Sequence, residues 1–130
     1  MPTSAVDRTE HREDALKCLY EADQRRLAPL SDDLGRRAAE LVEGVWVERE
    51  ALDEEIGRVS RRWRIERMPA IDRNVLRIAL WEIRNHARTP VAVVISEAVR
   101  IAKAYSTERS GRFVNGVLAK LASEREPASE

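Results

Sequence analysis

A stripe of cationic and aromatic side chains lies near the carboxyl end of the chain. At the helical spacing i, i+4, i+7 and i+11 it contains Arg109, Phe113, Gly116 and Lys120. Beside it runs an apolar face formed by Val114, Val117, Leu118 and Leu121. Cations around a half-exposed ring suit RNA, because cations bind phosphates and a ring stacks on a base. The plainer alternative is that Phe113 borders the core while the cations are solvated, and spacing alone favours this alternative.

Composition predicts one compact helical domain. The chain has 130 residues, of which 35% are charged and 5% are aromatic. Its longest apolar run, residues 91–95, is far too short to span a membrane. The N-terminal segment has no apolar stretch typical of a secretory signal. The single cysteine, Cys18, lies between apolar neighbours and indicates a buried thiol in a reducing cytoplasm. His11 and His86 have no partner at metal-ligand spacing, so no metal site is expected.

The net charge of zero hides two unequal halves. Residues 1–57 contain 8 Lys and Arg against 15 Asp and Glu, whereas residues 58–130 contain 15 against 8. A basic half can bind nucleic acid or an acidic partner. The alternative, which the sequence leaves open, is that the halves fold together and neutralise each other.

Apolar periodicity predicts an all-α domain over residues 8–123, between a disordered segment 1–7 and a disordered tail 124–130. The expected helices cover residues 8–26, 34–63 with a break near 46–51, 69–85, a segment opened by Pro90, and a last helix capped by Ser110 or Ser106. The helix over residues 69–85 is apolar almost all round and is expected at the centre of the fold. The apolar register also predicts that Trp63 is a core residue.

The sequence contains none of the motifs that indicate a catalytic or nucleotide-binding site. It has no phosphate-binding glycine loop and no nucleophile elbow. Glu54 and Glu55 are adjacent, so on a helix they point about 100° apart and do not face one reacting bond. We therefore expect a protein that is not an enzyme and has no cofactor.

Four segments together carry a resemblance to a known family. ALKCLYEAD, PAIDRNVLRIALWEI, ISEAVRIAK and FVNGVL, in this order and spacing, resemble the NusB family of bacterial transcription antitermination proteins. The resemblance implies about seven helices in two packed three-helix sub-bundles. It also implies binding of the boxA element of ribosomal RNA leader transcripts together with NusE, a small-subunit ribosomal protein. The pair would then join RNA polymerase and other Nus factors and suppress premature termination.

The resemblance also implies site residues. Phe113 matches an aromatic at the RNA surface, with Arg112 a basic residue beside it, and Asp72 matches an acidic residue where RNA and NusE meet. On the NusE side the implied residues are Tyr20, Asp72 and Arg77. Two alternatives stay open: Asp72 as an anion that the start of a helix favours, and Tyr20 as ordinary core packing.

Two departures from the family pattern concern RNA affinity. The arginine run that often begins the family is reduced here to Arg8 and Arg12 among acidic neighbours, which predicts fewer phosphate contacts. Arg109 stands where relatives are often acidic and can restore part of the loss, together with Lys120 in the same stripe.

Other functions remain open at this stage. One is a protein-interaction module that binds NusE with little RNA affinity. Another is an RNA-recognition domain related to the N-terminal part of ribosomal RNA cytosine methyltransferases, although this chain ends without room for a catalytic domain. Self-association into a homodimer is a further possibility that the sequence does not decide.

Overall fold

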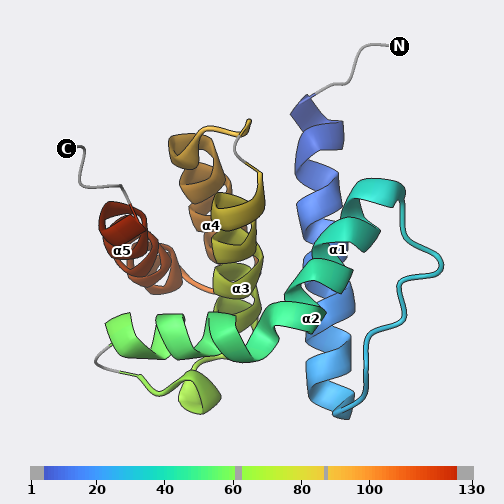
Figure 1. Ribbon diagram of the computed structural model, residues 1–130, viewed down its shortest axis with the longest axis horizontal. Helices are drawn as coiled ribbons and strands as arrows, with labels where there is room; N and C mark the ends of the chain where they lie inside the picture. Colours follow the sequence, from blue (N-terminus) through green and yellow to red (C-terminus); the bar gives the residue numbers. More distant parts are fainter. Residues whose placement is uncertain (1–4, 61–62, 87, 126–130) are drawn as a thin grey trace.

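The described part of the chain folds into five α-helices and one short 3-10 helix (Figure 1). The computed structural model describes residues 5–60, 63–86 and 88–125, without the side chains of residues 5–9 and 125. The α-helices are α1 (Ala5–Arg25), α2 (Arg36–Val59), α3 (Ala70–Asn85), α4 (Val91–Tyr105) and α5 (Glu108–Arg125), and the 3-10 helix is η1 (Ile65–Arg67). No strand occurs in these ranges, and no helix there is long and apolar enough to cross a membrane.

The helices form two three-helix groups that share α3. On one side α1, α2 and α3 pack against one another, and on the other side α3, α4 and α5 do so (Figure 1). The predicted all-α class and the two three-helix groups are confirmed. The expected number of about seven helices is wrong for the described residues, because one central helix serves both groups.

The central position of α3 follows from its sequence. Apolar side chains surround it, and they are buried at Val75, Leu76, Ile78, Ala79, Leu80, Trp81 and Ile83. Pro69 precedes its first turn, and Pro90 does the same for α4, since proline lacks an N–H that a helix start would leave unbonded anyway. Both helix starts were predicted from these prolines.

The predicted break in α2 is wrong. Val45 and Leu52 are both buried and lie seven residues apart, which is two turns, so one helix face stays apolar across the polar residues between them. Glu48, where the apolar register is empty, accepts a hydrogen bond from Trp81 Nε1 at 3.3 Å and is itself held against α3. Figure 1 shows that α2 changes direction along its length while remaining one helix.

The start of α1, the end of α5 and the cap of α5 differ from the prediction. α1 begins at Ala5, and α5 continues to Arg125, where Glu124 pairs with Arg58 at 2.8 Å. The disorder expected for residues 1–4 and 126–130 falls outside the described residues. The cap of α5 is Thr107, whose hydroxyl accepts the Ser110 N–H at 3.0 Å.

The polar strip of α3 neutralises acidic residues of the amino-terminal half. Arg73 binds Asp23 of α1 at 2.8 Å, and Arg77 forms two hydrogen bonds of 2.7 Å with Asp53 of α2. Arg84 pairs with Glu55 of α2. The acidic and basic halves of the chain therefore fold together, which was one of the two alternatives left open by the charge distribution. These three arginines support the helix packing.

Cys18 is half-buried. Its Sγ donates to the carbonyl oxygen of Leu30 at 3.4 Å, which ties α1 to the loop before α2. Burial raises the pKa of the thiol, so it stays protonated at neutral pH.

Candidate nucleic-acid interface

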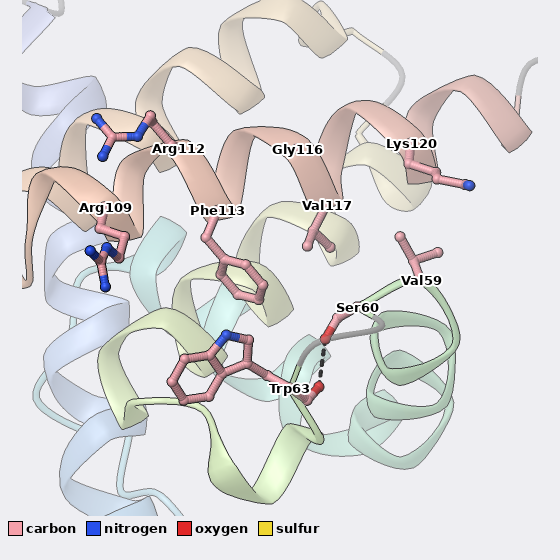
Figure 2. Close-up of a pocket in the computed structure, with 9 residues that line it drawn as sticks. All are labelled: Val59, Ser60, Trp63, Arg109, Arg112, Phe113, Gly116, Val117 and Lys120. Atoms are coloured by element: carbon pink, nitrogen blue, oxygen red, sulfur yellow. Dashed lines mark hydrogen bonds between the residues drawn. The ribbon is translucent and has the colours of Figure 1, made fainter.

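An open groove of about 910 Å³ separates α5 from the end of α2 and the segment that follows it (Figure 2). The residues that line it are Val59, Ser60, Trp63, Arg109, Arg112, Phe113, Gly116, Val117 and Lys120. The stripe predicted from the sequence is thus one wall of a groove. All three charged lining residues are cationic, so the groove favours an anionic ligand.

One face of α5 presents the Phe113 ring to the groove, and another face of the helix is buried in the core. Val114, Leu118 and Leu121 are buried in the core, and Phe113 is half-buried at the edge of the same core. In Figure 2 its ring points across the groove toward the segment after α2. Phe113 is therefore both a boundary core residue and an accessible ring, so the two alternatives raised by its spacing are compatible.

Unlike the arginines of α3, the groove cations form no ion pair among the described residues, although Glu124 is an acidic neighbour of Lys120. Arg109, Arg112 and Lys120 are exposed, and in the described part of the chain none of them lies within 4.0 Å of a carboxylate oxygen. Arg109 lies beside Phe113, whereas Arg112 and Lys120 extend away from the ring (Figure 2). Their charge is left available for phosphates, which arginine binds with two parallel hydrogen bonds.

Trp63 is a groove residue that the apolar register placed wrongly in the core. Its side chain is 43% exposed. The reason is that α2 ends at Val59, so the helical period that turned Trp63 inward stops before reaching it. The available signal was local: an aromatic residue follows a cluster of arginines beginning at Arg58, as expected for a ring on a cationic surface.

Asp72 does not line the groove and is buried at 3% exposure. Ser110 Oγ donates to its Oδ2 at 2.9 Å, and Ser110 Oγ also lies 2.9 Å from Ser106 Oγ, which ties the start of α3 to the start of α5. Burial raises the pKa of Asp72, and its Oδ1 has no hydrogen-bond partner among the described residues. The structure does not bring Asp72 into the groove.

Arg12, which was expected to contact RNA phosphates, is instead bound within the fold. Its side chain is buried, with Nε 2.7 Å from Glu82 Oε1 and Nη2 2.8 Å from Oε2. A guanidinium held in this way by a buried carboxylate is not exposed to a phosphate. Arg8 lies in the first turns of α1, but its side chain falls outside the described residues.

The residues expected on the NusE side lie apart from the groove. Tyr20 of α1 is 38% exposed, so it is not a core residue and its ring is accessible. Arg77 of α3 is bound to Asp53 and also donates to Asn74 at 3.0 Å. Tyr20 is therefore accessible on the surface of α1, while Arg77 holds α2 against α3.

Comparison with known proteins decides the family. The sequence profile of the NusB family matches residues 4–123. The chain belongs to the NusB family. The match includes all of the described helices except the last two residues of α5, so the two three-helix groups around α3 are the NusB-family fold in this chain.

Two relatives match along almost their full length. The transcription antitermination protein NusB of Kineococcus radiotolerans is 42% identical over 132 residues, which cover 94% of this chain and 97% of that protein. The protein of the same name from Anaeromyxobacter dehalogenans is 42% identical over 134 residues, covering 93% and 94%.

Solved NusB structures share the fold. T. maritima NusB superposes with a TM-score of 0.83 at 33% identity, covering 98% of this chain and 96% of that one. A chain from the crystal structure of antitermination factors NusB and NusE in complex with dsRNA has a TM-score of 0.77 at 25% identity, covering 93% and 99%.

Proposed function

We propose that this NusB-family protein is a transcription antitermination factor that binds boxA RNA of ribosomal RNA leader transcripts together with NusE. The groove beside α5 carries the proposal, because every charged side chain that lines it is cationic and two aromatic residues, the half-buried Phe113 and the exposed Trp63, also line it. Relatives matched nearly end to end bear the name of antitermination proteins. One structural neighbour was solved with NusE and RNA.

In the proposed RNA binding, the cations and the aromatic ring of the groove contact different parts of the RNA. Arg109, Arg112 and Lys120 bind backbone phosphates, and Phe113 stacks on a base. Arg8 and Arg12 were expected to add phosphate contacts, but the burial of Arg12 leaves most of the phosphate binding to α5. No step in this function is catalytic and none needs a cofactor. The protein would act in the cytoplasm, where bacterial RNA polymerase works.

The partner surface is proposed to lie on α1 around Tyr20, where an exposed ring with a polar hydroxyl suits a protein interface. Asp72 and Arg77 would act indirectly there, since both are bound within the fold and set the positions of α2, α3 and α5. This protein and NusE would bind boxA RNA together, and the resulting complex would then bind RNA polymerase and the other Nus factors.

A second candidate function is an interaction module that binds NusE with little RNA affinity. The observation that favours it is the internal pairing of Arg12, which leaves the first helix with fewer cations for RNA. The relationship to methyltransferase RNA-recognition domains has less support, because the relatives covered almost completely carry the antitermination name.

Reconstituted transcription tests the proposed function. RNA polymerase with the other Nus factors and NusE is given a template that carries boxA upstream of a terminator. The protein should increase read-through on this template and not on one with a scrambled boxA. Equal read-through on both templates, with or without the protein, would contradict the antitermination role. Sedimentation at the working concentration, in parallel, shows whether the protein acts as a monomer or as a homodimer.

A further inference from the structure

We propose that Trp63 is a second stacking residue of the groove and contacts an RNA base from the wall opposite Phe113. This inference rests on the proposed RNA-binding function and adds a residue to its site. The two rings come from segments fifty residues apart in the sequence and line one groove. In Figure 2 the indole of Trp63 lies below α5, on the side to which Phe113 points.

The exposure of the Trp63 indole is the first observation. A side chain of this size leaves 43% of its surface in solvent, whereas Trp81 in the same chain is 7% exposed and packs in the core. Exposed indole rings are costly in water and are enriched where a partner covers them. An RNA base is a flat partner of the right chemistry, and the neighbouring cations attract its backbone.

The anchoring of the segment around Trp63 is the second observation. The buried Ser60 donates its hydroxyl to the Trp63 carbonyl oxygen at 2.6 Å. After Trp63, Arg73 Nη1 donates to the carbonyl oxygens of Ile65 at 3.2 Å and Met68 at 3.0 Å, and Met68 is buried. The Trp63 carbonyl and the segment after it are therefore held by hydrogen bonds while the ring is exposed, which lowers the cost of ordering this surface on binding.

The position of the cations is the third observation. Arg109 stands beside Phe113 on the α5 wall, and Lys120 lies about three helical turns beyond Arg109 along the same wall. A strand bound along α5 would have its phosphates on these cations and its bases turned toward the opposite wall. Trp63 is the aromatic residue that lines this opposite wall.

The test compares Trp63→Ala and Trp63→Phe with the parent protein in complex with NusE and a fluorescent boxA RNA. Trp63→Ala should weaken binding about 5- to 150-fold, the range for removal of one base-stacking ring. Trp63→Phe should restore most of the affinity because it keeps an aromatic face. The parent's tryptophan fluorescence should be quenched by unlabelled boxA RNA, and Trp63→Phe should lose this quenching.

Trp46→Phe is the matched control. Trp46 is half-buried on α2 under the Arg49 guanidinium, 3.8 Å from its ring centroid, and does not line the groove, so this variant should keep the quenching and the affinity. Unchanged affinity and quenching in both Trp63 variants, with the parent binding boxA, would overturn the inference and leave the proposed function standing. A parent protein that does not bind boxA even with NusE would overturn both. Thermal melts should show each Trp63 variant folded, because the side chain is exposed.

Discussion

The guanidinium of Arg12 and the carboxylate of Glu82 form two hydrogen bonds, of 2.7 and 2.8 Å, across seventy positions of the chain. Their side chains are 8% and 2% exposed. The pair joins α1 to the central helix α3 at a buried position. An arginine that the family resemblance assigned to RNA is therefore bound within the fold, and the proposed RNA contacts fall to the cations of α5.

Removing one member of this pair should be strongly destabilising. Arg12→Ala removes the guanidinium that pairs with the buried Glu82 carboxylate, and Glu82→Ala removes the carboxylate that holds Arg12. Breaking a buried pair in this way should cost about 3–5 kcal/mol of unfolding free energy. Urea unfolding followed by circular dichroism measures this change. The control is Arg100→Ala, which breaks an exposed pair with Glu13 at 3.1 Å and should cost less than about 1 kcal/mol. Similar small losses in all three variants would mean that the buried pair does not hold α1 to α3.

Gly44 should tolerate no side chain, because α2 and α3 approach closely there. A Cβ on Gly44 would lie 2.2 Å from Trp81 Cε2, so Gly44→Ala must displace a packed indole and should lose about 1–3 kcal/mol. Gly57 on the same helix has no atom within 4 Å of its Cβ position, so Gly57→Ala should instead gain up to about 1 kcal/mol. Thermal melts of both variants show whether each substitution lowers or raises the stability. A stabilised Gly44→Ala would contradict the close packing of α2 and α3.

Asp72 should make stability depend on pH in a defined direction. Burial raises its folded-state pKa above the unfolded value, so the cost of the buried charge is absent below about pH 3.9 and grows as the pH rises through the folded pKa. Asp72→Asn removes this charge. The melting temperature of Asp72→Asn relative to the parent should therefore rise between about pH 4 and neutrality. A difference that is constant over this range, or that falls, would show that the carboxyl is not perturbed by burial.

Arg109 should contribute a phosphate contact in the groove. Arg109→Asp should weaken boxA binding and reduce the slope of log affinity against log salt by about 0.7, the value for one contact on a single strand. Arg36→Asp is a matched control, because Arg36 is exposed at the start of α2 while the other end of that helix borders the groove. The parent slope should persist in Arg36→Asp. If Arg109→Asp keeps the parent slope, Arg109 does not bind a phosphate.

The sequence allowed the helical class, the central helix and one wall of the groove to be predicted. The prolines before α3 and α4 and the apolar periodicity of α3 and α5 are local signals, and they were sufficient. The stripe of Arg109, Phe113 and Lys120 lies on one helix, so its spacing alone placed these residues together.

The features that the sequence could not predict depend on contacts between distant segments. From the sequence, Arg12 is predicted to be an exposed cation, whereas in the structure it binds Glu82, seventy residues away. Trp63 is predicted to be a core residue, whereas α2 ends at Val59 before its helical period reaches Trp63. The continuity of α2 across Glu48 likewise depends on Trp81 of α3, which gives the polar residue a partner. Local periodicity contains none of these tertiary partners.

Fluorescence anisotropy with a short boxA RNA tests the account most directly. The protein is titrated into boxA and scrambled RNA, alone and with NusE, at two salt concentrations, and Phe113→Ala is compared with Phe113→Leu to separate stacking from core packing. We expect preferential boxA binding that tightens with NusE, and a loss of about 1–3 kcal/mol in Phe113→Ala that Phe113→Leu does not restore. Equal, weak binding to both RNAs with NusE present, unaffected by either substitution, would contradict RNA recognition by the groove and support the interaction module.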